Sequence, residues 1–388
     1  MAISAVRERT GESALDACWA NATACAEQIA GRVVAGRFWR FKALTAVLAL
    51  TLLRAFPRLR RAGMAVRRGN LGSVQPLMEH PWADPTTLPH PADDARLRNL
   101  TFRRTPFLLA RLLRLRQTGM LMVLAASGVA LLYGTLAIAG SVSSRKAALY
   151  ICVAAACSWA GETDFHDLRG GYFDAMALTL LILAMQAAWP SAALCVFLAA
   201  WTDERSLLAS VFVVLFAALR GNGRMKLLAA PFGWVAYGAT RWLLASQGSM
   251  AGTTGGVGWA TLAQQANAIP LGLWSGLGGC WILIVAGIAS AVLQKRYKLF
   301  AGLCAAVGLV MLAAAAITDI TRTAAYAFPA VLVSVALLAR GEPIESVEKL
   351  AAAAAVVSWI VPTYYVQGSQ GFWWLYPLPV QVVRWMAA

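Results

Sequence analysis

The sequence has 388 residues, of which 59% are hydrophobic and only 13% are charged. Soluble domains carry about a quarter charged residues, so this composition argues against a soluble globular protein. The formal net charge of +16 does not indicate nucleic-acid binding, because basic residues flanking apolar segments are typical of membrane topology and of contact with anionic lipids.

Residues 1–40 mix acidic and basic side chains and contain no continuous apolar run. We therefore expect a cytoplasmic N-terminal segment rather than a secretory signal peptide, followed by a first membrane helix near 41–56 that serves as an uncleaved anchor. The seven cysteines include no CxxC pair, and most lie in apolar stretches. Neither a disulfide framework nor a metal site is expected from them.

Residues 57–117 are expected to form a large first periplasmic loop. Its proline-rich part offers Asp84, Asp93 and Asp94, any of which could act as a general base toward an acceptor hydroxyl, although an ordinary surface loop explains them equally well. Arginines between positions 96 and 116 alternate with Leu, Phe and Pro. That alternation predicts an amphipathic segment on the membrane surface.

The rest of the chain predicts an all-α, polytopic transmembrane helix bundle with about 9–11 spans, in a single membrane domain over 41–388. The expected spans lie near 41–56, 118–140, 147–161, 172–189, 190–219, 227–246, 269–293, 299–317, 322–339, 350–362 and 371–385. Short basic turns are typical of the cytoplasmic side, and those expected there are 145–146, 220–226, 294–298 and 340–349. The acidic loops then face the periplasm of a bacterial inner membrane.

One acidic stretch, GETDFHDLRGGYFDA at 161–175, lies between two apolar segments. Its six ionisable residues could orient a catalytic carboxylate or bind a sugar or a diphosphate; they are Glu162, Asp164, His166, Asp167, Arg169 and Asp174. A solvated turn is the alternative interpretation. A single histidine with flexible carboxylates is weak evidence for a metal, so no metal ligands are assigned.

A second stretch, AWTDERSLLAS at 200–210, places ionisable residues inside a long apolar segment, where charges are costly unless paired or facing a polar cavity. Thr202 is predicted to cap a helix whose first turn holds Asp203 and Glu204, which would favour both acids through the helix dipole. One acid could pair with Arg205 or Arg169, and the other could face a cavity. TDER is expected to divide the segment 190–219.

A third stretch, TDITRTAAYAFP at 318–329, contains Asp319 and Arg322, which lie three residues apart and therefore share a helix face. They are expected to pair. The pair is either a helix-terminal salt bridge or a guanidinium aimed at the phosphate of a lipid substrate.

The proline-rich first loop, GGYFDAMALTLLILAM, AWTDERSLLAS and DITRTAAYAFP together resemble bacterial inner-membrane proteins of exopolysaccharide polymerisation or export. The layout also resembles polytopic glycosyltransferases that use polyprenyl-linked donors. The resemblance implies a lipid-linked saccharide substrate, contact with membrane lipid and with other polysaccharide assembly proteins, and no nucleic acid. The chain differs in having no Asp-x-Asp in the first loop.

Two functions are expected from these features. The first is polymerisation or transfer of lipid-linked sugar units at the periplasmic face, and the second is export of such units by a flippase-type transporter. A non-catalytic assembly component is a third possibility. For transfer, the candidate catalytic residues are Asp203, Asp164, Asp84 and Asp93. The candidate substrate-binding residues are Glu162, His166, Arg169, Glu204, Arg205, Asp319 and Arg322. No motif in the sequence identifies a cofactor. The sequence also contains no P-loop that would indicate ATP-driven pumping.

Overall fold

The computed structural model describes residues 17, 20–21, 23–67, 74–81, 103–166, 173–221, 223–246 and 257–386. In the first half of the chain the helices are α2 (Trp39–Arg67), α3 (Val74–Glu79), α5 (Arg104–Leu112), α6 (Gln117–Val142), α7 (Arg145–Ala156), α8 (Trp159–His166), α9 (Asp174–Gln186) and α10 (Trp189–Thr202). In the second half they are α11 (Arg205–Ala209), α12 (Val211–Arg220), α13 (Arg224–Leu227), α14 (Ala229–Ser246), α15 (Trp259–Gln264), the 3-10 turn η2 (Ala266–Ala268), α16 (Ile269–Leu277), α17 (Cys280–Leu293), α18 (Tyr297–Ala315), α19 (Ile320–Ala325), α20 (Phe328–Gly341), α21 (Ile344–Ile360) and α22 (Leu378–Met386).

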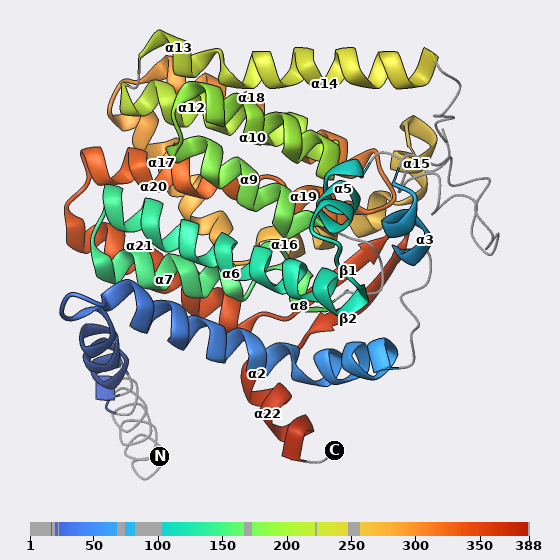
Figure 1. Ribbon diagram of the computed structural model, residues 1–388. Helices are drawn as coiled ribbons and strands as arrows, with labels where there is room; N and C mark the ends of the chain where they lie inside the picture. Colours follow the sequence, from blue (N-terminus) through green and yellow to red (C-terminus); the bar gives the residue numbers. More distant parts are fainter. Residues whose placement is uncertain are drawn as a thin grey trace.

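A row of helices forms one layer of the molecule. From top to bottom of Figure 1 it runs α14, α10, α9 and α6, each packed against the next, and α7 packs between α6 and α21. Helices α9 and α10 carry apolar side chains around their whole circumference, as expected for helices surrounded by other helices or by lipid. The prediction of a mainly helical protein is confirmed.

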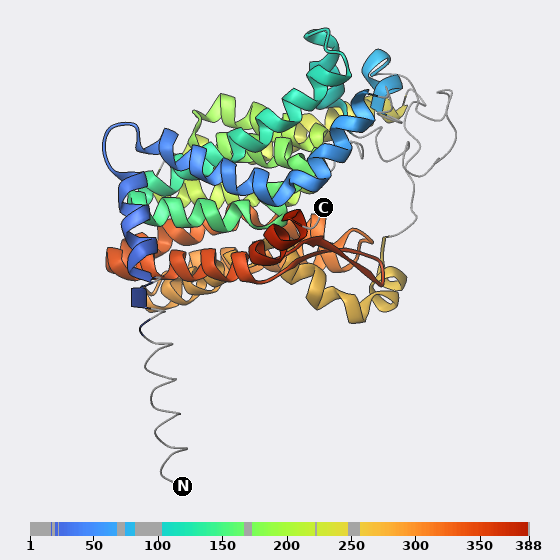
Figure 2. The same cartoon turned by 90° about the horizontal axis from the view of Figure 1, so that it is seen from below.

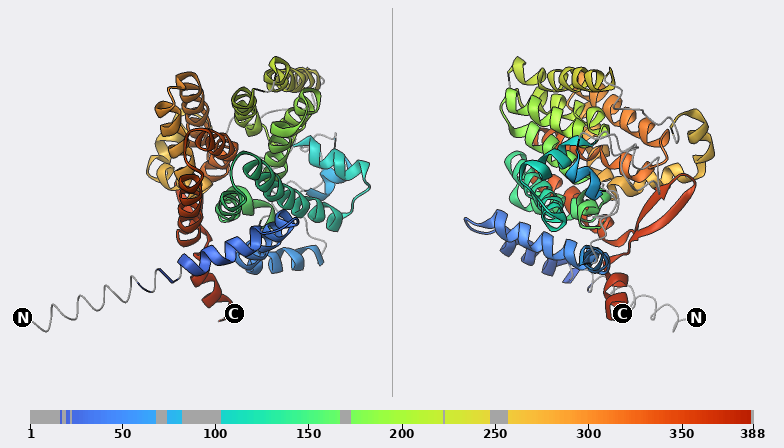
Figure 3. Two further views of the ribbon diagram at one scale, coloured as in Figure 1. Left: turned by 90° about the vertical axis from the view of Figure 1, so that its left-hand side faces the viewer. Right: turned by 45° about the vertical axis from the view of Figure 1, so that its right-hand side comes forward.

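Helices α17, α18, α20 and α21 form a second group behind this row, and α12 contacts helices of both groups. Helix α20 contacts both α12 and α17, and α18 contacts α12 and α17. The views in Figures 2 and 3 show this group lying alongside the first row. Every side chain of α20 from Phe328 to Leu338 is buried, so this helix lies in the centre of the core.

Three described helices are long and apolar enough to cross a membrane: Thr118–Val142, Tyr297–Ala315 and Ile320–Gly341. They match the spans predicted near 118–140, 299–317 and 322–339. The pair Ala266–Leu277 and Cys280–Leu293 passes the same test together but bends by 88°. The described part of the chain therefore has three such helices, or four if the bent pair counts as one span.

The bend between α16 and α17 falls at two glycines. Gly278 has a φ of 54°, which glycine adopts without the steric cost that a Cβ would bring. The Gly279 amide donates to Ser358 Oγ at 2.9 Å, and any Cβ on Gly279 would meet the backbone of α21. These two residues let the chain turn while α17 begins in close contact with α21.

The C-terminal span predicted at 371–385 is wrong, and so is the expectation of a purely helical fold. Strands β1 (Thr363–Gln367) and β2 (Gln370–Leu375) form an antiparallel hairpin, and the short helix α22 follows. Aromatic residues in both strands favour extended structure, and Gly368, with a φ of 60°, lies in the turn. The Gly368 amide donates to the Thr318 carbonyl, which attaches the hairpin to the segment before α19.

The predicted start of the first loop at residue 57 is also wrong. Helix α2 continues through Pro57 to Arg67, and the later helices α3 and α5 occupy part of the expected loop. The segment expected on the membrane surface is partly buried, because Arg103 and Arg104 have exposed fractions of only 7% and 2%. Residues 68–73 and 82–102 lie outside the described residues.

Candidate functional site

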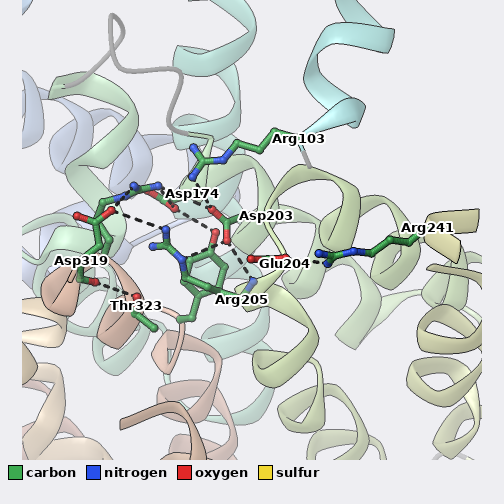
Figure 4. A network of polar contacts seen from close by, with 10 residues as sticks. Arg103, Asp174, Asp203, Glu204, Arg205, Arg241, Asp319 and Thr323 are labelled. Carbon is green, nitrogen blue, oxygen red and sulfur yellow. Dashed lines mark hydrogen bonds and ion pairs between the residues drawn. The ribbon is translucent and has the colours of Figure 1, made fainter. Parts of the chain in front are cut away.

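Ionisable side chains from distant parts of the sequence meet where several helices begin or end. Asp174 opens α9, Asp203 lies in the break between α10 and α11, and Asp319 precedes α19. Figure 4 shows these three carboxylates around the guanidinium groups that connect them. We call the set formed by Asp174, Asp203, Asp319, Arg103, Arg205 and Arg322 the inner charge cluster.

Arg322 is the central cation of this cluster. Its Nε and Nη2 atoms donate to the two carboxylate oxygens of Asp174 at 2.8 and 3.0 Å, a bidentate arrangement. Its Nη1 donates to Asp319 Oδ2 at 2.8 Å, as the i,i+3 spacing predicted. Only 1% of the Arg322 side chain is exposed. One guanidinium therefore joins the start of α9 to the start of α19.

Asp203 is surrounded by arginines from three different segments. Its Oδ2 lies 3.3 Å from Arg103 Nη2 and 3.8 Å from Arg322 Nη2, and its Oδ1 lies 3.4 Å from Arg205 Nε. The same Oδ1 accepts the backbone amide of Arg205 at 3.1 Å. Of the two acids and two arginines that the sequence left open as partners, Asp203 and Arg205 form a pair.

Asp319 connects the cluster to the C-terminal hairpin. The Tyr365 hydroxyl donates to Asp319 Oδ1 at 2.6 Å, and Arg205 Nη2 lies 3.8 Å from Asp319 Oδ2. Burial alone would raise the pKa of the Asp319 carboxyl, but Arg322, Arg205 and the Tyr365 hydroxyl outweigh it and hold that pKa below its usual value. Asp319 is therefore an anion at neutral pH.

The cluster balances its own charge, since three carboxylates face three guanidinium groups. The Tyr326 hydroxyl, one helical turn after Arg322, also donates to Asp174 Oδ1 at 3.1 Å. The Arg205 guanidinium lies 5.9 Å from the centre of the Tyr326 ring, where the ring face attracts a cation. This pairing compensates the charges of the four buried side chains, Arg103, Asp174, Asp203 and Arg322, and of the partly buried Arg205 and Asp319.

Two polar atoms of the cluster have unused hydrogen-bonding capacity. Asp203 Oδ2 and Arg205 Nη1 are buried, and neither has a hydrogen-bond partner among the described residues. The ion pairs of Asp203 Oδ2 compensate its charge, but they are longer than a normal charged hydrogen bond. One acceptor and one donor are thus left for an additional polar group.

Glu204 belongs to a different pair from its neighbours. Its Oε2 accepts from Arg241 Nη1 at 2.8 Å, and about half of the Glu204 side chain is exposed, at 51%. Arg241 also donates to the Tyr237 hydroxyl at 2.8 Å. Glu204 therefore attaches the break after α10 to α14, outside the inner charge cluster.

Glu162 forms a second buried pair under the hairpin. Its Oε1 lies 3.6 Å from Arg54 Nε, and both side chains are fully buried. Arg54 also donates to the backbone carbonyls of Cys157 and Tyr376, at 3.4 and 3.3 Å. In the same helix as Glu162, the Trp159 ring stacks on Tyr365 at 5.1 Å, so α8 supports the tyrosine that reaches Asp319.

The structure thus brings together four of the predicted site residues, namely Asp203, Arg205, Asp319 and Arg322. It places Glu204 and Glu162 in the two separate pairs. The other candidates are not described at the level of their side chains. Asp164 and His166 belong to α8 but only their backbone is described, and Arg169, Asp84, Asp93 and Asp94 lie outside the described residues.

The predicted capping role of Thr202 is wrong. Thr202 is the last residue of α10, and its hydroxyl donates back to the Leu198 carbonyl at 2.8 Å. Asp203 follows in an extended conformation, with φ of −157° and ψ of 126°, and its side chain accepts the Arg205 amide. The acid rather than the threonine therefore satisfies a backbone donor at the break, as Asp commonly does at helix starts.

Three residues that complete the site, Arg103, Tyr326 and Tyr365, are not among the candidates expected from the sequence. Asp174 is expected only as one of several charged residues in its stretch. A carboxylate that opens a wholly apolar helix was a usable signal for Asp174. Arg103 carries no comparable signal, because it is one of many basic residues in its region.

Among the described residues, no group of three or more His, Cys, Asp or Glu side chains is placed to hold a metal ion. Comparisons with protein-family models, with curated proteins and with solved structures find no match.

Proposed function

We propose that this protein acts in a membrane on a lipid-linked saccharide, transferring or polymerising its sugar units with the inner charge cluster as the reactive centre. The observation that supports the proposal is the gathering of the buried Asp203 and Arg322 with the partly buried Arg205 among apolar helices. Ionisable groups buried among membrane helices are costly, and they mostly mark substrate or ion pathways.

The unused hydrogen-bonding atoms suggest roles for two residues. Asp203 Oδ2 can accept the proton of an acceptor hydroxyl, and Arg205 Nη1 can donate to a phosphate oxygen. In the proposed step, the acceptor oxygen bonds to the anomeric carbon while the bond from that carbon to the diphosphate breaks. The hydroxyl proton passes to Asp203, and the electron pair leaves with the lipid diphosphate, whose charge Arg205 stabilises.

The proposal retains the finer arrangement expected from the sequence. The protein is then a multi-pass protein of a bacterial inner membrane, with about nine to eleven spans and its acidic loops in the periplasm. Other polysaccharide assembly proteins are its expected partners.

Replacement of Asp203 by Asn in the native host tests the proposal. The variant keeps the size of the side chain but removes the base, so we expect polymer to be lost and lipid-linked single units to accumulate. Glu345→Gln is the matched carboxylate-to-amide control, since Glu345 is an exposed residue in the first turn of α21. Normal polymer in the Asp203 variant, at a normal protein level in the membrane, would contradict the assignment.

Export of the lipid-linked units is a second candidate, and the broken helices favour it. The chain interrupts α10 and α11 at Asp203 and bends by 88° between α16 and α17. Transporters often bind their substrates where membrane helices are discontinuous. The two candidates differ in where units accumulate when Asp203 is replaced. Loss of transfer leaves single units at the outer face, whereas loss of export leaves them at the inner face.

A further inference from the structure

Three arginines lie together at the end of the bundle opposite to the inner charge cluster. Arg220 ends α12, Arg296 precedes α18, and Arg340 is the penultimate residue of α20. Helix α12 packs against both α18 and α20, so the three helix ends are neighbours. The membrane-length segment Ile320–Gly341 separates them from Asp319. We call Arg220, Arg296 and Arg340 the basic corner.

The backbone around the basic corner is fixed by short-range contacts. Gly221, with a φ of 69°, ends α12 in the left-handed conformation. The Gln294 side chain donates to the Leu337 carbonyl at 3.0 Å, which holds the turn between α17 and α18 against α20. The three arginines therefore project from a rigid junction of helix ends.

The charge of the basic corner is not neutralised by the described residues. None of its three arginines forms an ion pair with a described carboxylate, and the positive charges of Arg220 and Arg296 act on Arg340. Glu342 lies close in sequence but accepts from the Ser290 hydroxyl at 3.3 Å. The pKa of Lys226, in the adjacent helix α13, is lowered by burial and by the positive charge of Arg220. This region therefore has a local excess of positive charge.

Exposed apolar side chains lie directly beside this charge. Leu293 at the end of α17 is 75% exposed, and Tyr297 at the start of α18 is 62% exposed. They flank Arg296 in the sequence, so a cationic group and an apolar surface occur within a single turn. A ligand that combines a phosphate with hydrocarbon chains matches both features.

We propose that the basic corner is a binding site for an anionic phospholipid of the surrounding membrane. The planar guanidinium groups match the oxygens of a headgroup phosphate, and the acyl chains lie along the exposed sides of α17 and α18. The lipid compensates the charge of three arginines that the described protein leaves unpaired. This site is separate from the proposed sugar-transfer site and does not depend on that function.

The purified full-length protein in neutral-detergent micelles provides the test. Phosphatidylglycerol is added, and the bound lipid is counted by native mass spectrometry, with zwitterionic phosphatidylcholine as the reference lipid. We expect a clear preference for phosphatidylglycerol that weakens with salt. The triple variant Arg220→Gln, Arg296→Gln, Arg340→Gln should bind it about 10- to 100-fold more weakly. The matched control is Arg111→Gln, Arg114→Gln, Arg116→Gln, which removes three exposed arginines near α5 and should keep most of the binding.

Three results would overturn the proposal. The first is equal binding of the two lipids by the wild-type protein. The second is an equal loss of binding in the triple variant and the control, which would indicate unspecific attraction. The third is competition by soluble inorganic phosphate at the same concentration as the lipid, which would identify a free phosphate ion as the ligand. If the triple variant does not fold, the three single variants, compared at the same salt concentration, decide between these results.

Discussion

At the scale of single residues, Arg322 holds the inner charge cluster together, because it contacts all three of its carboxylates. Replacing it by Met leaves Asp174 without its bidentate partner in a buried position. Removing one partner of a buried ion pair costs about 3–5 kcal/mol. We therefore expect Arg322→Met to lower the free energy of unfolding by about that amount, measured as thermal unfolding in detergent.

A control for this prediction is Arg224→Met, which removes an exposed arginine of α13. A surface substitution of this kind changes stability by only about 0.5 kcal/mol. Equal melting temperatures for the two variants would contradict this prediction. They would mean that the attraction between the charges of the cluster only offsets the cost of burying them.

The depressed pKa of Asp319 predicts a dependence of stability on pH. The unfolded carboxyl has a pKa of about 3.9, and the folded one titrates lower. The stability that Asp319 contributes is therefore fully present above its unfolded pKa and is lost as the pH falls through its folded pKa.

Asp319→Asn lacks this titration, so the difference in melting temperature between wild type and variant should shrink as the pH is lowered from 6 toward 3. The measurement is a series of thermal melts at constant ionic strength. A difference that stays constant over this range would show that Asp319 is not the titrating group.

Local spacing was enough to predict one part of the site. Asp319 and Arg322 pair because residues three apart share a helix face, whereas the sequence left open which acid of the 200–210 stretch pairs with Arg205. The bond from Arg322 to Asp174 spans 148 residues, and no local pattern encodes it. The sequence thus identified the charged groups but not most of their partners.

At the scale of elements, the bend between α16 and α17 depends on Gly279. A Cβ at this position would meet the Ala354 carbonyl oxygen and the Ser358 hydroxyl of α21. We expect Gly279→Ala to push α17 away from α21 and to destabilise the protein by about 1–3 kcal/mol, as overpacking does.

Gly308→Ala is the matched control. Gly308 lies inside α18, and a Cβ there would meet no atom within 4 Å. Because Ala is favoured over Gly in a helix by about 1 kcal/mol, this change should be neutral or stabilising. Thermal melts of both variants decide the point, and a stable Gly279→Ala protein would contradict the close packing of these two helices.

Helical periodicity and apolar length predicted the long helices well but could not predict the hairpin. The segment 371–385 contains Trp, Phe, Leu and Val, which are apolar in a helix and in a strand alike. Tertiary contacts favour the strands: Thr321 Oγ1 accepts the Val366 amide at 3.0 Å and donates to the Tyr364 carbonyl, which holds β1, the pairing partner of β2, against α19. Those contacts come from α19, more than forty positions earlier.

At the scale of the whole molecule, the two charged regions should lie on opposite sides of the membrane. Gln370 is exposed in the hairpin turn, near the inner charge cluster, whereas Glu345 is exposed near the basic corner. In a background with cysteines 18 and 25 replaced by serine, we expect a membrane-impermeant thiol reagent to label Gln370→Cys in intact cells.

The same reagent should label Glu345→Cys only after the membrane is permeabilised, since basic turns are retained on the cytoplasmic side. Labelling of both positions from one side would contradict the arrangement. If Glu345→Cys were labelled in intact cells and Gln370→Cys only after permeabilisation, the two regions would still lie on opposite sides of the membrane, but the protein would have the inverted orientation.

The separation of Asp174 from Arg322 has a consequence for biosynthesis. The ribosome completes α9 and α10 long before it reaches Arg322 and Tyr326, the two residues that hydrogen-bond to Asp174 and lie 148 and 152 positions later. During that interval a bare carboxylate opens an apolar helix, so the insertion machinery or water must shield it. A nascent chain arrested before residue 322 should therefore remain accessible to proteases, whereas one released after α20 can close around its charges.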